Sequence, residues 1–142
     1  MIILNESTDD ESSCKKYTNH TKCEIKQFID KCINLIKHGK RDYLSSTDKN
    51  FNFQVEYGIQ DIWKIVLLIS VEYFCYSADD YKITKNGMKK EKVYIFKIPY
   101  AIEDKSTDIY LKLKIRKKLK SEDVFVLSFH KPEKPLKSLW NS

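Results

Sequence analysis

Ionisable side chains recur at every second position between residues 109 and 116, and an imidazole ends the next apolar run. These side chains are Tyr110, Lys112, Lys114, Arg116 and His130. Histidine titrates near neutral pH and can take up or release a proton, whereas lysine and arginine can hold a phosphate. Metal-free RNA cleavage needs a base for the 2′-hydroxyl proton, an acid for the departing 5′-oxygen, and cations for the charge of the transition state. The pattern therefore allows ribonuclease chemistry, with His130 as the general acid or base and Lys112 as the phosphate-binding cation.

Two predicted strands would position these side chains. Apolar and polar residues alternate over Ile109–Arg116, which is typical of a strand with one buried face, and the run Val124–Phe129 is β-branched and aromatic. A turn centred on Lys120 would join them as an antiparallel hairpin. The predicted cross-strand pairs are Tyr110 with His130, Leu111 with Phe129, Lys112 with Ser128, Leu113 with Leu127, and Ile115 with Phe125. The polar face would then be a rigid platform of a phenol, an imidazole and cations, although a merely solvated strand face would give the same pattern.

The charge balance points to a polyanionic partner. The 142 residues, enough for one domain with a hydrophobic core, carry a formal net charge of +6. Residues 1–13 contain four acidic and no basic residues, so the remainder has 26 basic and 16 acidic residues and a net charge of +10. Such an excess favours binding to nucleic acid.

Several function classes have no support in the sequence. The four cysteines show neither a CxxC spacing nor a partnered histidine cluster, so no zinc site is expected. Asp79 and Asp80 are the only adjacent aspartates after residue 13, and neighbours on a strand rarely chelate one ion from the same face. No apolar run approaches membrane-spanning length, and Cys32 sits at an apolar helical position that suits a buried thiol in a reducing compartment. We therefore expect a cytoplasmic protein without metal, cofactor or membrane.

The rest of the chain predicts a single α+β domain over residues 21–142, preceded by a flexible leader over residues 1–20. Thr21 and Glu24 have the spacing of a capping box, and apolar residues then follow the helical period as far as a stop at Gly39. A second main helix is expected over Ile59–Ile69. The expected fold is an antiparallel sheet, made of a C-terminal three-stranded meander plus a possible short strand, packed by these two helices.

Smaller elements are predicted between and after the main ones. They are a short strand at Asp42–Leu44, a short helix at Asn50–Tyr57, one more helical turn capped by Ser70, a lysine-rich loop at Tyr81–Lys92 turned at Asn86-Gly87, a strand at Val93–Ile98 ended by Pro99, and an extended tail docked by Leu136, Leu139 and Trp140.

Four segments occur in an order that resembles a known family. They are VYIFK at residues 93–97, IYLKLKI at 109–115, VFVLSFH at 124–130 and KPEKPLK at 131–137. Together they resemble the MqsR family of toxins from type II toxin–antitoxin modules, and the likeness extends over roughly Cys23 to Leu136. The resemblance implies a RelE-like fold and a ribosome-independent endoribonuclease that cuts mRNA at short sequences. It also implies a cognate antitoxin protein that neutralises the enzyme.

The resemblance also implies roles for single residues. The family's strand tyrosine falls on Tyr110, the lysine two residues later on Lys112, the basic residue closing the SF motif on His130, and a functional lysine after the turn near Tyr76. We therefore assign Tyr110, Lys112 and His130 to catalysis, and Lys114, Arg116 and Tyr76 to RNA binding. Two other functions stay open, a catalytically inactive RNA-binding module and a protein-interaction domain of the same fold. The loss of a cation at Tyr76 favours the inactive module.

Overall fold

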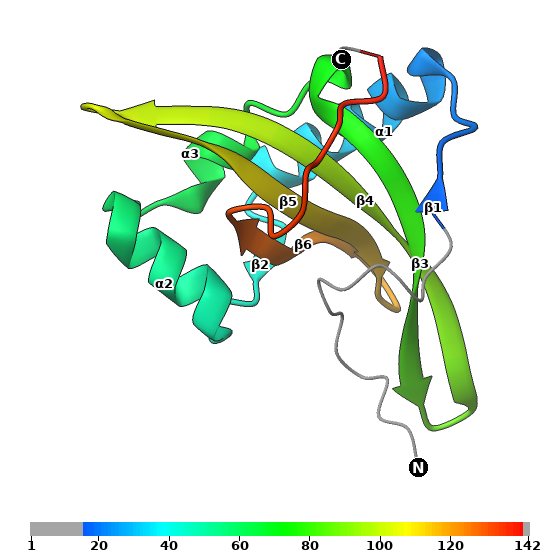
Figure 1. Cartoon of the computed structure of the whole chain (residues 1–142). Helices are drawn as coiled ribbons and strands as arrows, with labels where there is room; N and C mark the ends of the chain where they lie inside the picture. Colours follow the sequence, from blue (N-terminus) through cyan, green and yellow to red (C-terminus); the bar gives the residue numbers. More distant parts are fainter. Residues whose placement is uncertain (1–15, 141–142) are drawn as a thin grey trace.

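The computed structural model describes residues 16–140, apart from the side chain of Lys82, and has an α+β fold (Figure 1). Its elements in chain order are β1 (Lys16–Tyr17), α1 (Lys22–Lys37), β2 (Arg41–Tyr43), α2 (Asp48–Tyr57), α3 (Ile62–Val66), the 3-10 helix η2 (Val71–Tyr73), β3 (Phe74–Thr84), β4 (Gly87–Ile102), β5 (Lys105–Lys117) and β6 (Glu122–His130). The six strands form one sheet in the order β1-β3-β4-β5-β6-β2. Neighbouring strands are antiparallel except β2 and β6, which are parallel. The predicted α+β class is confirmed, but the sheet is mixed and larger than a three-stranded meander.

The first helix forms where the sequence predicts it. The Thr21 hydroxyl accepts the amide of Glu24, and the Glu24 carboxylate accepts the amide of Thr21 at 2.8 Å, so the capping box is complete. Apolar residues spaced three and four apart along α1 are buried in the main core. The helix ends before Gly39, whose φ of 74° suits a residue without a side chain.

The short elements predicted on either side of residue 48 are also confirmed. The strand expected at Asp42–Leu44 is β2, shifted by one residue. The helix expected at Asn50–Tyr57 is α2, which begins two residues earlier because the Thr47 hydroxyl caps the amide of Asn50.

The second main helix is much shorter than predicted. Instead of Ile59–Ile69, α3 spans only Ile62–Val66, because Asp61 caps its start and the amides of residues 68 and 69 bond three residues back, which turns the chain out of the helix. Ser70 makes no side-chain cap bond, and the turn after it is the 3-10 helix η2. The apolar residues of the segment are nevertheless buried as predicted, and Trp63 packs beside them.

The lysine-rich segment predicted as a loop is the arm of a long hairpin. β3 and β4 stay paired from Asp79 with Lys92 out to Thr84 with Gly87. The prediction of a loop over Tyr81–Lys92 is therefore wrong, whereas the turn predicted at Asn86-Gly87 is present. The sequence hides these strands because residues 83–90 are exposed on both faces, which removes the alternation that marks a half-buried strand. The arm projects away from the rest of the sheet (Figure 1).

Pro99 does not end its strand, since β4 continues to Ile102 and pairs Pro99 with Asp108. Pairing between β4 and β3 stops at Phe96, so beyond this point β5 is the only described strand beside β4. Proline is tolerated on such an edge, because no neighbouring strand loses a hydrogen bond when the N–H is missing. The polar connection expected up to Asp108 is therefore a second hairpin arm.

The β5–β6 hairpin departs from the predicted register at one bulge. The pairs Tyr110–His130, Leu111–Phe129 and Lys112–Ser128 are confirmed, whereas Leu113 pairs with Val126 and Ile115 with Val124. The side chain of Asn50 occupies the edge of β6 at this point, where its amide donates to the Leu127 carbonyl at 3.0 Å and its oxygen accepts the Phe129 amide at 2.8 Å. The extra residue in β6 turns Leu127 and Phe125 to the side of the sheet opposite the main core.

Both faces of the sheet are covered. The helix face joins α1, α2 and α3 in the main core, to which the strands contribute Phe74, Phe96, Ile98, Ile109, Leu111, Leu113, Val124, Val126 and Phe129. The opposite face, called the second face below, carries a smaller cluster of Cys75, Tyr76, Ala78, Val93, Ile95, Tyr110 and Leu127. The C-terminal tail crosses the sheet on this side (Figure 1) and packs Leu136 onto the second-face cluster.

Docking of the tail is confirmed at its end. The amide of Leu139 donates to the Phe74 carbonyl at 2.7 Å, and the Trp140 ring lies 5.7 Å from the Phe74 ring between centroids. Leu139 and Trp140 pack against the main core, so the tail passes from the second face round to the helix face.

The predicted leader, residues 1–20, lies mostly outside the described residues. Its last residues belong to the fold, because β1 pairs with β3 at Ser77 and Ala78. The Tyr17 hydroxyl donates to Asp79 at 2.8 Å, and His20 Nε2 lies 2.8 Å from the Ser77 hydroxyl.

Candidate functional site

The second face brings a phenol and an imidazole into direct contact. Tyr110 of β5 and His130 of β6 are cross-strand partners, and their rings stack with centroids 5.5 Å apart and planes at 13°. Both side chains stand on paired strands, so the backbone fixes their separation. The structure thus brings two of the three predicted catalytic residues together.

The surroundings of His130 determine its tautomer. Its Nδ1 lies 2.8 Å from the carbonyl oxygen of Lys131. A carbonyl oxygen can only accept, so Nδ1 must carry the hydrogen of this bond. In the neutral ring the lone pair then belongs to Nε2, and this nitrogen is the one that could take up a proton.

The residues that are paired across neighbouring strands form a row on each face of the sheet. Lys112, the third predicted catalytic residue, lies on the second face in the row next to that of Tyr110 and His130. Its partners across the sheet are Ile95 on β4 and Ser128 on β6. Tyr76 belongs to the same row, because it is the partner of Ile95 on β3. The lysine that the family resemblance expects near Tyr76 is absent, but the Lys16 ammonium of β1 lies 4.7 Å above the Tyr76 ring and supplies a positive charge there.

Sequence reasoning also missed the cation that lies in the row of Tyr110 and His130. Lys97 of β4 is the direct cross-strand partner of Tyr110 and is half-buried. It therefore extends the row of Tyr110 and His130 across three strands. The signal was present, since Lys97 follows Val93 and Ile95 at the same strand period, but the predicted platform was limited to the β5–β6 hairpin.

The two predicted RNA-binding cations at the end of β5 are engaged with carboxylates. The ammonium of Lys114 lies 3.4 Å from Asp80 and 3.1 Å from Glu91. Arg116 donates from Nε to Asp123 at 2.9 Å and from a terminal nitrogen to the other Asp123 oxygen at 2.6 Å. To contact RNA, both side chains would have to exchange these partners for phosphate.

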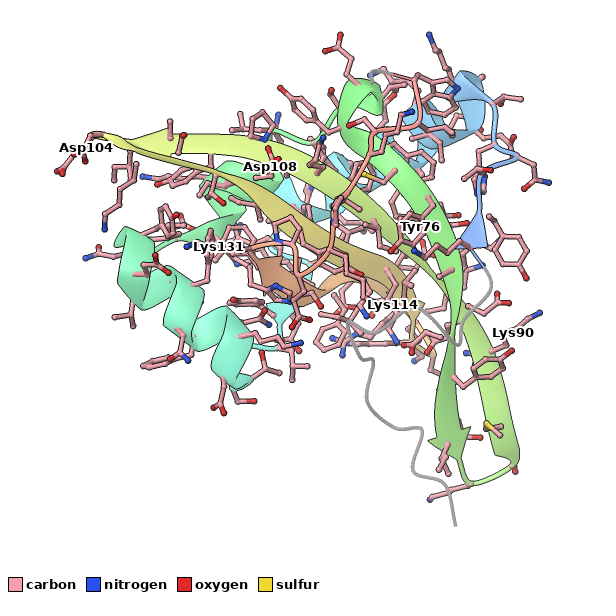
Figure 2. All side chains as sticks on the ribbon, in the orientation of Figure 1. Tyr76, Lys90, Asp104, Asp108, Lys114 and Lys131 are labelled. Atoms are coloured by element: carbon pink, nitrogen blue, oxygen red, sulfur yellow. The ribbon has the colours of Figure 1, made fainter. Side chains whose placement is uncertain are left out.

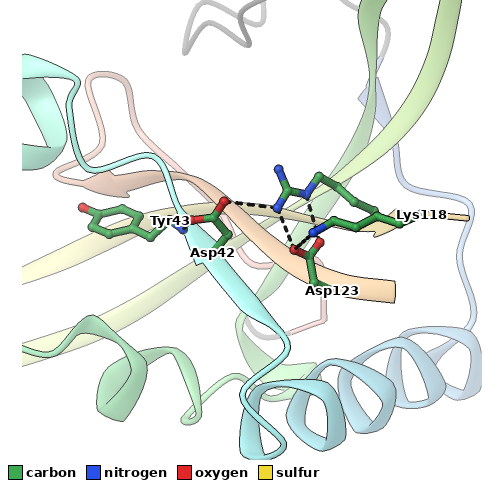
Figure 3. Close-up of polar contacts among 5 residues, drawn as sticks. Asp42, Tyr43, Lys118 and Asp123 are labelled. Atoms are coloured by element: carbon green, nitrogen blue, oxygen red, sulfur yellow. Dashed lines mark hydrogen bonds and ion pairs between the residues drawn. The ribbon is translucent and has the colours of Figure 1, made fainter. Parts of the chain in front are cut away.

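Arg116 is the centre of a surface ion-pair network with Asp42 and Asp123, two residues that Figure 3 labels. Its guanidinium also reaches Asp42 of β2 at 3.2 Å, and Lys118 reaches Asp123 at 3.1 Å. The hydrogen bond from Arg116 is the main cause of the lowered pKa of Asp123, and the same bond raises the pKa of Arg116. The network joins β2, β5 and β6, which gives it a role in holding the sheet edge together.

The site is more enclosed than a strand face with this sequence would suggest. Tyr110 is 6 % exposed, Lys112 1 % and His130 4 %. Figure 2 shows Tyr76 and Lys114 on this face and Lys131 at the end of β6. An opening exists beside α2, where His130 and Lys131 line a cleft of about 190 Å³ together with Phe53 and Glu56. His130 is therefore the member of the site that a small part of a substrate could reach first.

Comparison with known proteins adds no family to these observations, because no family model, curated protein or solved structure matches the chain. Residues 16–140 contain no cluster of three or more histidine, cysteine, aspartate or glutamate side chains that could hold a metal ion. None of the helices described here has the length and apolar character needed to cross a membrane. On the second face, His130 is the side chain able to transfer a proton, and Lys97 and Lys112 supply positive charge on β4 and β5.

Proposed function

We propose that this protein is a cytoplasmic, metal-independent endoribonuclease of the toxin type, with a RelE-like fold as in the MqsR family that its sequence resembles. One observation carries the proposal: the stacked pair of Tyr110 and His130, with Nε2 as the basic ring nitrogen, shares its row with Lys97 and has Lys112 in the neighbouring row. An acid–base group, a phenol and phosphate-binding cations on rigid strands are the set that cleavage by the 2′-hydroxyl requires.

In the proposed reaction, His130 Nε2 accepts the proton of the 2′-hydroxyl as this oxygen attacks the adjacent phosphorus. The bond from phosphorus to the 5′-oxygen breaks, and the departing oxygen receives the proton back from His130. The products are a 2′,3′-cyclic phosphate and a free 5′-hydroxyl. Lys112 and Lys97 hold the phosphate charge, and Tyr110 orients the substrate by its hydroxyl or by stacking on a base.

Access to the phosphate-binding cation needs a conformational change. The cleft beside α2 reaches His130, whereas Lys112 is almost completely covered. A phosphate therefore contacts Lys112 only after the chain that covers the second face has moved aside. Tail movement belongs to the proposal, because the tail crosses this face between β6 and the Phe74 carbonyl.

The direct test compares His130→Ala with His38→Ala on a short fluorescent RNA. His38 is exposed at the end of α1, and its ring contacts the Asn34 carbonyl of its own helix, which makes it a matched control. We expect a loss of ~10²–10⁴-fold for His130→Ala, typical of a general acid–base residue, and no loss for His38→Ala. Cleavage should continue in EDTA and stop when the nucleotide before the cut lacks its 2′-hydroxyl. Undiminished cleavage by His130→Ala, or strict dependence on a divalent ion, would overturn the mechanism.

The expected partners are mRNA and a cognate antitoxin, and growth in a bacterial host tests both. A free ribonuclease harms its own cell, so expression of the chain alone should arrest growth, and co-expression of the antitoxin should restore it. His130→Ala should be harmless yet still bind the antitoxin, since one truncated side chain leaves most of an interface intact. Arrest by His130→Ala as strong as by the parent would place the toxicity elsewhere in the molecule.

A second candidate function is RNA binding without cleavage. It is favoured by the burial of Lys112 and His130 and by the tyrosine at position 76, where the resemblance expects a lysine. In that case RNA affinity would fall with salt at a slope near −0.7 per phosphate contact in a plot of log affinity against log salt concentration. The parent protein and His130→Ala would then retain equal affinity, and neither would yield cyclic-phosphate products.

A further inference from the structure

The cleft between the arm of β3 and β4 and the end of the β5–β6 hairpin has no place in the proposed ribonuclease site. It holds about 360 Å³. Six side chains of its lining matter for ligand chemistry, namely Phe28, Lys31, Lys89, Lys92, Tyr94 and Lys117. We propose that this cleft, called the lysine cleft below, binds a nucleoside phosphate.

The charges of the lysine cleft favour an anion. Four lysines and two glutamates line it, and both glutamates already have partners: Glu122 binds Lys31 at 3.0 Å, and Glu91 binds Lys114 at 3.1 Å. Within residues 16–140, the ammonium groups of Lys89 and Lys117 form no ion pair or hydrogen bond. They come from two different strands, β4 and β5, and both line the cleft, so a phosphate bound there could receive hydrogen bonds from both.

The floor of the lysine cleft suits a flat apolar group. The rings of Phe28 on α1 and Tyr94 on β4 stack with centroids 3.8 Å apart and planes at 23°. Both rings are only partly buried, and Ile115 lies beside them in the same cleft. An aromatic platform next to unpaired cations is the arrangement that proteins use to stack a nucleobase while holding its phosphate. The ligand class that satisfies both parts of the cleft is therefore a base with a phosphate attached.

The lysine cleft is separate from the site around His130. Lys117 lies seven residues beyond Tyr110 on β5, about 23 Å at the rise of a strand. Ile115 of the cleft packs against the main core and Glu91 reaches Lys114 on the second face, but Tyr110, Lys112 and His130 are not part of the lining. The inference consequently does not depend on the proposed ribonuclease activity. Its ligand has two possible sources, a nucleotide unit within single-stranded RNA or a free mononucleotide.

Calorimetric titration of the full chain tests the cleft with AMP, adenosine, ribose 5-phosphate, inorganic phosphate and a six-nucleotide oligo(A). We expect AMP to bind more tightly than adenosine or either phosphate without a base. The variant Lys89→Ala/Lys117→Ala should lose at least about tenfold in AMP affinity, since hydrogen bonds to charged groups are each of that order. The charge-matched control is Lys37→Ala/Lys64→Ala, which removes two exposed lysines away from the cleft and should bind as the parent does.

A second variant separates stacking from charge. Phe28→Leu keeps an apolar side chain but removes the ring, so it should weaken AMP about fivefold or more and leave ribose 5-phosphate unchanged. A merely structural role for Phe28 would weaken both. Oligo(A) binding that is tighter than AMP binding and is weakened by Lys89→Ala/Lys117→Ala would identify RNA as the source, and equal binding would identify a free nucleotide.

Two results would overturn the inference. One is failure of both AMP and oligo(A) to bind, which would mean that the ligand of the cleft is an acidic protein segment and not a nucleotide. The other is an equal loss of affinity in the double variant and in its charge-matched control. Ribonuclease activity is measured by cleavage of the fluorescent RNA and the lysine cleft by the effect of its own variants on AMP binding, so the two proposals can fail independently.

Discussion

Both faces of the sheet are buried, but they are built from different residues. The helix face is almost entirely apolar and follows the helical and strand periods of the sequence. The second face buries a lysine at position 112, another at position 114, a histidine and two tyrosines. No side-chain nitrogen or oxygen buried in the described part of the chain lacks a hydrogen-bond partner. Polar residues can thus line an interior when each has a partner, whereas apolar ones need only the right shape.

The two faces also differ in how they contribute to the stability of the fold. Burial of apolar groups on the helix face stabilises the fold directly. On the second face, the attraction between Lys114 and its two carboxylates offsets the loss of their hydration, so the net contribution is small as long as all three are present. The helix face should therefore dominate stability, and the second face should be the one that opens locally.

Thiol reactivity should give the largest difference. Burial raises the pKa of Cys75 on the second face from 9.0 to about 12, so its thiolate at pH 8 is reduced by about 10³, and it should react far more slowly than the exposed Cys23. Pulsed alkylation with mass spectrometry measures both rates. On gentle heating, Cys75 should become reactive before Cys32 of the helix face. Simultaneous exposure of Cys75 and Cys32 would contradict a separately opening second face.

Phe74→Ala tests the helix face. Phe74 is fully buried, with the rings of Phe96 and Trp140 at 5.6 and 5.7 Å, so its loss should lower the free energy of unfolding by about 3–5 kcal/mol. Urea denaturation measures the change. Leu119→Ala is the control, because Leu119 is completely exposed and its truncation should change stability by less than about 0.5 kcal/mol. A small effect of Phe74→Ala would mean that the core rearranges to fill the space.

Lys114→Met tests the second face. Removing the ammonium leaves Asp80 and Glu91 partly buried next to each other without a cation, which should lower the free energy of unfolding by about 3 kcal/mol. The triple variant Asp80→Asn/Glu91→Gln/Lys114→Met has no charge left to satisfy and should regain most of the loss. If the triple variant is as unstable as Lys114→Met, the lysine stem contributes packing that methionine cannot replace.

The smallest effect is expected at Asp123, and it should depend on pH. The pKa of Asp123 is lowered in the folded state, mainly by the hydrogen bond from Arg116. A lowered folded pKa means that the stabilisation is complete above the unfolded pKa, about 3.9, and is lost as the pH falls through the folded value. Asp123→Asn should therefore be less stable than the parent by about 1 kcal/mol at pH 7, and the gap should close below about pH 4. A gap independent of pH would exclude this ion pair as its source.

The sequence predicts the parts of the fold in which a local signal and the tertiary environment agree. The capping box and apolar period of α1 are such a case, and so are the three pairs around Tyr110, Leu111 and Lys112. The bulge could not be predicted, because it coincides with one hydrogen bond that Asn50 donates and one that it accepts, 77 and 79 residues away along the chain. The arm of β3 and β4 was missed because neither of its faces is buried, so it has no alternation to detect.

The candidate site was predictable in its residues but not in its setting. Strand alternation correctly groups Tyr110, Lys112 and Lys114 on one face with His130. It does not reveal that the tail passes over this face, since docking of Leu136 and Leu139 depends on positions distant in sequence. The carboxylate partners of Lys114, Asp80 and Glu91, come from β3 and β4, whose pairing was not predicted, so Lys114 was assigned to RNA binding instead of to an ion pair.

The amide of Asn50 has a consequence for how these molecules behave in a crowded solution. β2 covers the outer edge of β6 only as far as Val126, and the next carbonyl and amide groups, at Leu127 and Phe129, are occupied by this one side chain. A strand from another molecule cannot form hydrogen bonds with these two backbone groups, so it cannot extend the sheet from this edge. A single asparagine on α2 thus protects this edge against polymerisation and strand exchange between copies of the protein. Other proteins protect such edges with charged residues or prolines.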